Sequence, residues 1–531
     1  DMHVPLRAGS DLAVLGGLIN HVINSERWNS DPFFKEYVTH YTNAPVLIDP
    51  TYRDTEDLEG LFSGYDPETR QYTIDSWQYA AQQESSPTPG GPDAEQDAGQ
   101  TAEARTQQLG RLSGPVLKDM TLEDPNCVFQ IIKRHFARYT PEMVEQVSGI
   151  PQNLFLKLAE TILDNSGRER TTSFCYAVAW TQHTTGTQII SCCAMLQLLL
   201  GNIGRPGGGI LALRGHATIQ GSTDIPTLYN LLPGYLPMPS TTSGHETLRG
   251  YLETETPPTG WWHNMPKYMV SLLKAWYGDS ATPENDFQYD LVPKISGDYS
   301  FQSMIPMMRD GIIKGLFCMG MNPAVGGQNA VLGRQALATL DWLVIRDCYE
   351  VETAAFWYDA PEVRRGEVSP ADIGTEVFLL PPAVTPEKEG SYTNTQRLVQ
   401  WHDKAVEPPG DSRSEPWFLH RLGTRLLELY ADEDTPQARQ LRAITWDYPL
   451  VGEHQEPDIE AVLAEINGWM VADGKQVRNF LDHQDDGSTA CGCWIYSGIM
   501  PERDQNRAKQ RRGDDKAALE WGYAWPNNVR I

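Results

Sequence analysis

The stretch GNIGRPGGGILALRGHATIQGSTD, residues 201–224, combines many glycines with one arginine that follows an apolar run. Seven of its 24 residues are glycine, and only Arg205 and Arg214 are cationic. A guanidinium is always charged and offers a planar fork of donors that matches a carboxylate. Arg205 lies between Gly204 and Pro206 and is typical of a loop contact. Arg214 raises the question of what a single cation does after an apolar run, and a structural ion pair with a neighbour such as Asp224 is one answer.

The composition is that of a large, acidic, globular chain. Its 531 residues suggest about three or four domains at roughly 150 residues each. With 40% hydrophobic residues, the chain can bury sizeable cores. The formal net charge of −27 repels nucleic acid and anionic lipid, so neither is expected as a partner. No apolar run reaches the ~20 residues of a membrane span, and no signal peptide is recognisable.

The cysteines do not follow a metal-binding pattern. None has C-x-x-C spacing, and neither the adjacent pair nor the C-G-C pair matches zinc or iron–sulfur motifs. We expect buried free thiols and no disulfide scaffold. The eight cysteines are Cys127, Cys175, Cys192, Cys193, Cys318, Cys348, Cys491 and Cys493.

The N-terminal part predicts helices around one low-complexity segment. Residues 11–23 place apolar side chains on one helical stripe, with Ser10 or Asp11 as N-cap. The preceding PLRAGS sets Arg7 and Gly9 before a helix N-terminus, which is either an anion or guanine site or a plain cap. Residues 81–114 are polar and rich in proline and glycine, which predicts a flexible acidic insertion. Helical periodicity returns near residue 126 and again from Pro151.

The segment before the glycine-rich stretch predicts a strand and then a helix. Residues 172–180 form a strand-like run, and residues 187–204 begin as an apolar helix expected to be buried on every side. Gly201 is a natural stop for that helix, and the residues after it are expected to form a loop.

Residues 312–380 alternate strands and helices, which predicts a parallel, doubly wound sheet. In such sheets ligands bind beyond the carboxyl ends of the strands. A nucleotide-like group is therefore expected on the loops that follow the first two strands, with ordinary strand-to-helix turns as the alternative. The residues on these loops are Gly320, Met321, Asn322, Arg346 and Asp347.

Ten short segments fall in an order that resembles the catalytic subunit of respiratory formate dehydrogenases. They include LRAGSD, YTNAP, GLFSGYDPETRQY, WTQHTTGTQ, LLLGNIGRPGGG, LRGHATIQGSTD, MGMNP, GSYTNTQR and ACGCWIYSG. The resemblance covers nearly the whole chain outside the acidic insertion. It implies an oxidoreductase with a molybdenum or tungsten centre held by two pyranopterin guanine dinucleotides.

The resemblance also implies an architecture. We expect an α/β, multi-domain molybdopterin oxidoreductase with doubly wound, mostly parallel sheets. The expected domains are residues 1–215, a cofactor and substrate domain that carries the insertion, then the dinucleotide-binding residues 216–385, and residues 386–531. The chain is expected to be a middle piece. The iron–sulfur motif and the selenocysteine or cysteine ligand would lie upstream, and a final domain downstream.

The family's motifs assign roles to individual positions. Arg214, in LRG, would bind and orient formate. His216 stands where relatives can carry glutamine, and would contact the pterin or assist proton departure. Val178 replaces a methionine of some relatives, and Asn322 an aspartate. The implied cofactor-binding residues are Arg7, Gly9, Ser10, Asp11, Val178, Gln182, Gly215, Gly320, Asn322, Gly326, Arg346 and Asp347, with Ser391, Asn394, Thr395 and Arg397 held loosely; no metal ligand is assigned.

The implied activity is the oxidation of formate to carbon dioxide, with electrons passed through a 4Fe-4S cluster of the complete subunit. The implied partners are formate, an iron–sulfur beta subunit and a membrane cytochrome b, on the periplasmic side. Two alternatives remain open. One is another molybdopterin oxidoreductase, acting on nitrate, a sulfoxide or arsenic, and the other is a cofactor-binding fragment without activity of its own.

Overall fold

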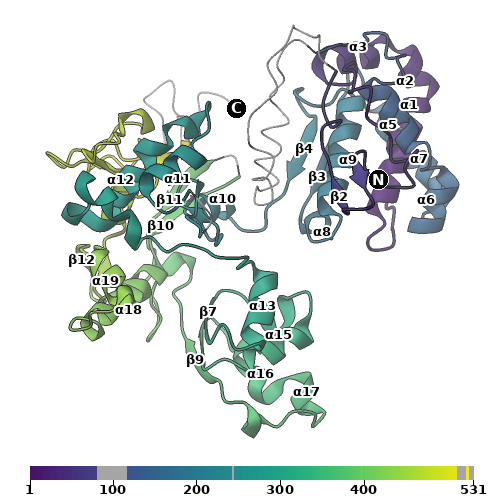
Figure 1. Cartoon of the computed structure of the whole chain (residues 1–531). Coiled ribbons are helices and arrows are strands. Elements are labelled where there is room, and N and C mark those ends of the chain that lie inside the picture. The colour runs from purple at the N-terminus through teal and green to yellow at the C-terminus, as the bar shows by residue number, and fades with distance from the viewer. Residues whose placement is uncertain (81–115, 242–243, 396, 511–521, 525–531) are drawn as a thin grey trace. The chain divides into compact units, whose positions relative to one another are not determined.

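The computed structural model describes residues 1–80, 116–241, 244–395, 397–510 and 522–524 (Figure 1). The predicted insertion at 81–114 lies outside these residues. The chain forms two compact units, Asp1–Gly215 and His216–Ile531, and each is described by itself. The predicted division into three domains stays a prediction. In the described part of the chain, no helix is both long and apolar enough to cross a membrane.

The first unit is mainly helical and carries a short parallel sheet. Strands β3 and β4 pair in parallel, with Tyr176 opposite Ala212, and the shorter strands β1 and β2 form a hairpin. The elements are α1 (Asp11–Asn24), α2 (Glu26–Ser30), α3 (Pro32–Tyr41), β1 (Tyr65–Asp66), β2 (Gln71–Tyr72), α5 (Val128–Phe136), α6 (Pro141–Ser148), α7 (Gln152–Asp164), β3 (Ser173–Tyr176), α8 (Val178–Thr181), α9 (Gly186–Leu199) and β4 (Gly209–Ala212).

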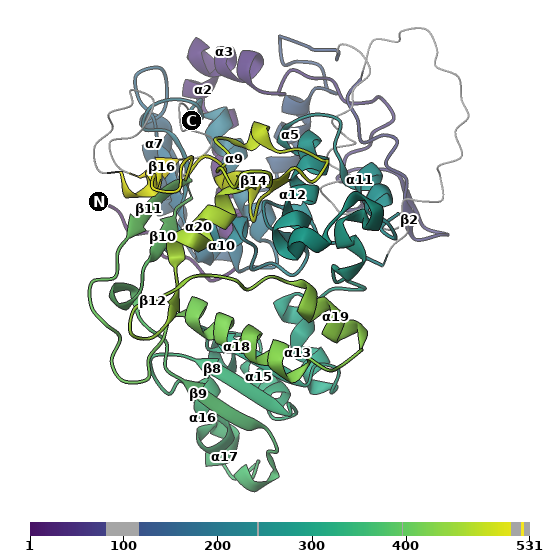
Figure 2. The ribbon, with the colours of Figure 1, turned by 90° about the vertical axis from the view of Figure 1, so that its left-hand side faces the viewer.

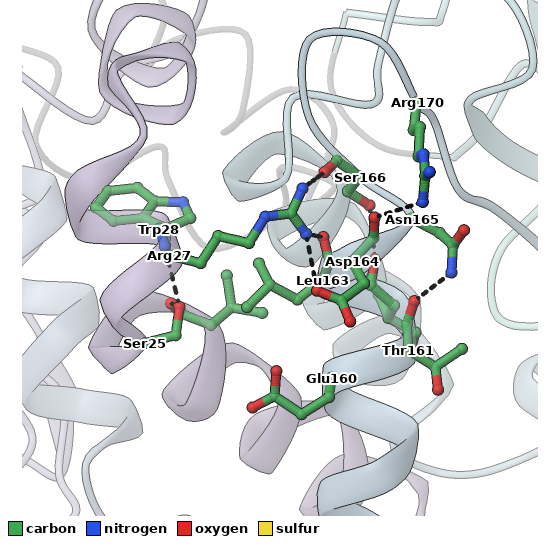
Figure 3. Close-up of polar contacts among 12 residues, drawn as sticks. Ser25, Arg27, Trp28, Glu160, Thr161, Leu163, Asp164, Asn165, Ser166 and Arg170 are labelled. Atoms are coloured by element: carbon green, nitrogen blue, oxygen red, sulfur yellow. Dashed lines mark hydrogen bonds and ion pairs between the residues drawn. The ribbon is translucent and has the colours of Figure 1, made fainter.

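Helix α1 is the centre of this unit's core. Its apolar stripe buries Ile19 and Ile23 completely, as the spacing predicts, against α6, α7 and α9. Figure 3 shows how α2 is fixed to the end of α7. Arg27 donates to the backbone carbonyls of Leu163 and Ser166, so its charge lies at the negative end of the α7 dipole. The helices predicted near residues 126 and 151 are confirmed as α5 and α7.

Three local predictions in this unit are wrong. Strand β3 ends at Tyr176, and Val178 already begins the short helix α8. Helix α9 is not buried all round, because Thr187, Gln188 and Ser191 are exposed. The residues after Gly201 are not only loop, since Gly209–Ala212 add a strand to β3. That pairing joins residues far apart in sequence, so local patterns could not reveal it. The predicted helix stop is confirmed, with Gly201 at a φ of 67°.

The second unit contains two separate cores. One surrounds the three-stranded sheet of β7, β8 and β9, and the other surrounds α12 and the C-terminal segments. Its elements are α10 (Ile219–Asp224), β5 (Leu231–Leu232), β6 (Leu236–Pro237), α11 (Leu248–Glu255), α12 (Met265–Tyr277), α13 (Phe301–Arg309), β7 (Gly315–Met319), α14 (Pro323–Gly326), α15 (Ala330–Leu337), β8 (Trp342–Arg346), α16 (Glu352–Asp359), α17 (Pro361–Arg364), β9 (Glu376–Leu380), β10 (Gly390–Thr393), β11 (Leu398–His402), α18 (Glu415–Leu429), α19 (Pro436–Ala443), β12 (Leu450–Val451), β13 (Glu456–Pro457), α20 (Ile459–Asn467), β14 (Trp469–Met470), β15 (Thr489–Ala490) and β16 (Tyr523–Ala524).

The β7–β8–β9 sheet is parallel, as the alternating pattern predicts. Leu343 and Ile345 point from β8 into the core that also contains residues of α15 and α16. On the other face, Phe418 of α18 packs against Phe317, and α18 is seen beside the sheet in Figure 2. Helices on both faces of a parallel sheet confirm the predicted α/β class with a doubly wound sheet.

Candidate functional site

Arg214 lies just beyond the carboxyl end of β4, next to the end of β3. The backbone N–H of Leu213 donates to the carbonyl of Tyr176 at 2.7 Å, which extends the strand pairing by one residue. Val178 and Gln182, on and after α8, follow β3 directly. The carboxyl edge of a parallel sheet thus carries three of the predicted residues, where ligands of such sheets bind.

The side chains of Arg214 and His216 are both exposed. Neither makes a hydrogen bond or an ion pair with the residues that the structure describes. Asp224, the alternative partner, is buried within the second unit, and its carboxylate accepts hydrogen bonds from other residues of that unit. Arg214 is therefore a cation without a structural task inside that unit.

The start of α1 is connected to the same edge. Trp180 of α8 donates its indole N–H to Asp11 at 3.0 Å. Ser10 is the N-cap residue, but its hydroxyl donates to the Arg7 carbonyl instead of accepting a helix N–H. The Arg7 guanidinium donates to the carbonyls of Gln146 and Val147 at the end of α6. Arg7 therefore supports a helix terminus. Gly9 has a φ of 85°, and no atom lies within 4 Å of where its Cβ would be.

A buried carboxylate network holds α10, the helix that follows His216. Asp224 has no exposed surface, and its carboxylate accepts hydrogen bonds from Gln220 (2.8 Å), Tyr235 (2.7 Å) and Tyr496 (2.9 Å). Burial is the first cause that raises the pKa of both tyrosines, so both hydroxyls stay protonated donors. The His216 carbonyl accepts from the N–H of Ile219 at the start of α10. The network thus fixes the helix that follows His216.

The GSYTNTQR segment lies beside α10. The N–H of Thr393, at the end of β10, donates to the Thr218 hydroxyl at 3.2 Å, and the Thr393 and Tyr496 hydroxyls are hydrogen-bonded at 3.0 Å. Asn394 and Arg397 form the turn into β11, with Arg397 at a φ of 60°. The positive charge of Arg397 also lowers the pKa of Tyr235, against the larger effect of burial. The GSYTNTQR segment and α10 are therefore neighbours.

The loops after β7 and β8 meet at the sheet edge. The N–H of Gly320 donates to the Arg346 carbonyl at 3.0 Å, and Gly320 has a φ of 65°. The Asn322 side chain is hydrogen-bonded within the fold. Its amide oxygen accepts from both the N–H and the hydroxyl of Thr353. Its amide nitrogen donates to Glu352 at 2.6 Å. Asn322 therefore ties α14 to α16 and has little bonding capacity left for a base.

Arg346 is buried against α18 and the residues that precede it. Its side chain is 3% exposed, lies 4.5 Å from the Phe418 ring centre and donates to the Arg413 carbonyl at 2.6 Å. Burial lowers its pKa, and its Nε has no partner among the described residues. Arg346 thus joins β8 to α18. The Asp347 carboxylate is partly exposed and caps its own loop by accepting from Cys348. Gly326 ends α14 with open space around it.

No cluster of three or more metal-ligating side chains occurs in the described ranges. All eight cysteines are free, as predicted, but Cys175 and Cys348 are exposed instead of buried. Sequence reasoning missed the structural importance of Tyr235 and Tyr496. The only local sign was the run QGSTD, which places a carboxylate one turn after Gln220.

Curated relatives match this chain from end to end. It is 37% identical to the nitrate-inducible formate dehydrogenase major subunit of Escherichia coli K12 and 38% to the formate dehydrogenase 2 subunit alpha (cytochrome c-553) of Nitratidesulfovibrio vulgaris. Each alignment covers 100% of this chain and 50% of the relative. The chain is homologous to formate dehydrogenase major subunits. It spans about half the length of the curated relatives it matches.

Other comparisons add less. The formate dehydrogenase subunit alpha of Megalodesulfovibrio gigas is 34% identical over the whole chain and 50% of its own length. No family model matches. Among solved structures, acetylene hydratase from Pelobacter acetylenicus aligns with 80% of this chain and 41% of its own, at 15% identity and a TM-score of 0.38, which is too low to define a common fold. The formate dehydrogenase relationship therefore comes from the sequence alignments.

Proposed function

We propose that this chain is the part of a formate dehydrogenase catalytic subunit that binds formate and contacts its cofactor. One observation carries the proposal. Arg214 is an exposed guanidinium without a structural partner among the described residues, at the carboxyl edge of the β3–β4 sheet. It lies inside a chain that aligns throughout with formate dehydrogenases. A cation that the fold does not use is available for a substrate carboxylate.

The glycines support a bulky cofactor beside Arg214. Gly215 has no positive φ, and no atom lies within 4 Å of where its Cβ would be. The described fold thus gives no reason for glycine there, whereas the close approach of an outside group does. Gly326 has the same property. These positions fit a molybdenum or tungsten centre with two pterin guanine dinucleotides, which would supply the acceptor for two electrons.

The chain's own residues would bind formate, orient it and contact the cofactor. Formate oxidation gives carbon dioxide, one proton and two electrons. The Arg214 fork would hold the formate oxygens and fix which way the C–H bond points. The His216 ring, joined to α10, would contact the pterin edge, with removal of the released proton as its alternative role. Asp11, Val178 and Gln182 would line the cofactor at the carboxyl edge of the β3–β4 sheet.

The wider assignments extend this proposal. The complete subunit would contain a 4Fe-4S cluster and pass electrons to an iron–sulfur subunit and a membrane cytochrome b on the periplasmic side. They rest on the resemblance of the motifs to respiratory formate dehydrogenases.

Substrate preference tests the proposal. The full-length protein, purified with its cofactor, should reduce a viologen dye with formate as donor. It should not oxidise reduced viologen with nitrate, a sulfoxide or arsenate. Nitrate reduction without formate oxidation would mean that the chain belongs to another kind of molybdopterin oxidoreductase. Tight cofactor binding without either activity would leave only the role of a cofactor-binding chain.

A further inference from the structure

The hairpin of the first unit displays aromatic side chains that the core does not use. Four of them form one contiguous cluster, here called the aromatic platform, made of Phe62, Tyr65, Tyr72 and Trp77. Ring centres lie 5.9 Å apart for Phe62 and Trp77, 6.3 Å for Phe62 and Tyr72, and 5.1 Å for Tyr65 and Tyr72. Phe62 is 56% exposed and Tyr72 is 41% exposed. Leu61 and Ile74, on the same segment, are exposed as well.

A hollow opens next to this platform. Trp77 belongs to both, since it also lines an apolar pocket of about 320 Å³ together with Ile48, Tyr52, Tyr79 and Ile131. The pocket size suits one or two apolar side chains. Aromatic residues around such a pocket are the usual anchors of protein–protein interfaces.

The platform is held rigidly. Trp77 donates its indole N–H to the Ser63 carbonyl at 2.7 Å, and the Ser63 and Ser76 hydroxyls bond at 2.9 Å in the interior. Gly64 has a φ of 86°, and a Cβ there would lie 1.9 Å from the Thr73 carbonyl oxygen, so the strands approach closely. Asp66 caps the hairpin turn through Glu68 and Thr69. A surface that is already ordered loses little entropy when it binds a partner.

The chain segment that carries the platform is acidic. Between residues 55 and 75 there are six carboxylates and one arginine, a far stronger bias than the 70 acidic to 43 basic residues of the whole chain. Asp57, Glu59, Glu68 and Asp75 are exposed on this segment. An acidic rim repels anionic lipid and nucleic acid, and it attracts lysine and arginine.

We infer that the aromatic platform is a docking surface for a separate polypeptide that inserts an apolar side chain flanked by lysine or arginine. Its apolar centre would enter the pocket beside Trp77, and its basic residues would meet the acidic rim. The inference stands on the platform, the pocket beside it and the acidic segment, and it does not depend on formate as substrate.

A photo-crosslinker at Phe62 tests this surface. The full-length protein, with p-benzoylphenylalanine in place of Phe62, would be expressed in its native host and isolated with its bound chains before irradiation. We expect a cross-link to another polypeptide, at an apolar residue with lysine or arginine close by in its sequence. The double variant Glu68→Lys, Asp75→Lys should lower the cross-link yield about fivefold, because the rim charges steer association. The same crosslinker at Leu429, 60% exposed on α18, is the control for background.

Other outcomes overturn the inference. Cross-links that stay within the chain would mean that one of its own segments covers the platform. Cross-links to lipid, or none above the Leu429 background, would exclude a docked polypeptide. A partner site without basic residues, or a yield that charge reversal leaves unchanged, would contradict the proposed chemistry. Formate oxidation by Phe62→Ser should stay at the normal rate, so failure of this inference is distinct from failure of the proposed function.

Discussion

Tyr496 donates its hydroxyl to the buried carboxylate of Asp224 at 2.9 Å, although 272 positions separate the two residues in the sequence. This bond attaches the C-terminal part of the second unit to α10, the helix that begins just after His216. Among the described residues, the Asp224 carboxylate has no cationic partner, and neutral hydroxyl and amide donors satisfy it instead. A buried charge held only by hydrogen bonds depends strongly on each of them.

Removing these donors should destabilise the second unit. Tyr496→Phe keeps the ring and deletes one hydroxyl, which leaves Asp224 with two donors. We expect a loss of about 1–3 kcal/mol in the free energy of unfolding, the cost of an unmet bond to a buried charge. Urea unfolding of the variant against the parent measures it. Tyr349→Phe, at a residue that is 78% exposed, is the matched control and should change little. Equal stability of Tyr496→Phe and the parent would contradict the network.

Two glycines of the 201–224 segment should respond differently to alanine. A Cβ at Gly208 would lie 2.0 Å from the Asn202 carbonyl oxygen, so Gly208→Ala should cost several kcal/mol or prevent folding. Gly215→Ala meets open space and should change stability by less than about 0.5 kcal/mol. We expect Gly215→Ala to lower cofactor content or formate turnover in the complete enzyme. Normal cofactor and turnover would mean that nothing approaches Gly215 closely.

Acid should weaken the second unit through His483. This imidazole is fully buried, with Nε2 2.7 Å from the Ser497 hydroxyl, and burial lowers its pKa from 6.5 to about 4. Because the unfolded chain takes up the proton at the higher pH, stability is complete above pH 6.5 and is lost as the pH falls toward 4. The loss should be about 2 kcal/mol between pH 7 and pH 5.

Chemical unfolding at the two pH values measures this effect. His483→Gln, which removes the ionisation, should flatten the pH dependence. His40→Gln, at an exposed histidine, serves as the comparison, and its stability should depend on pH as that of the parent does. If His483→Gln retains the full acid sensitivity, other groups are responsible.

The two roles of His216 can be separated in the complete enzyme. If the ring contacts the pterin by a hydrogen bond, His216→Gln should keep most of the turnover, since an amide can replace that bond. In that case the pH profile of kcat should keep its shape. If the ring takes the proton, His216→Gln should slow turnover and remove one limb of the profile. We expect the first result. Metal analysis of the variant is the control, because it shows whether the molybdenum or tungsten centre is still bound.

The sequence predicted what depends on local periodicity. The stripe of α1 and the alternation of β7, α15, β8, α16 and β9 are visible in short windows, so these elements were predicted correctly. The pairing of β4 with β3 joins Ala212 to Tyr176, and no local pattern marks it. Among the site residues, the glycines and Arg214 stood out by composition. The Asp224–Tyr496 bond did not, because only the tertiary fold brings these residues together.

The hydrogen bonds that Asn322 and Arg346 make within the fold could not be predicted from the sequence either. Both were placed at the correct sheet edge by topology. Their side chains are bonded to Thr353 and to the Arg413 carbonyl, contacts that depend on how α16 and α18 pack. Their roles toward a nucleotide stay predictions. The edge itself keeps Gly320 and Gly326 as its open positions.

Formate kinetics of Arg214→Lys in the full-length, cofactor-loaded protein test the central claim most directly. Lysine keeps the charge and loses the two-pronged fork. We predict a KM for formate raised about tenfold or more and a kcat lowered by a similar factor, about 1.4 kcal/mol for each tenfold change. Metal and guanine content should stay at the parent level, as should the stability of the first unit. Unchanged KM and kcat would contradict the assignment of Arg214 as the residue that binds and orients formate.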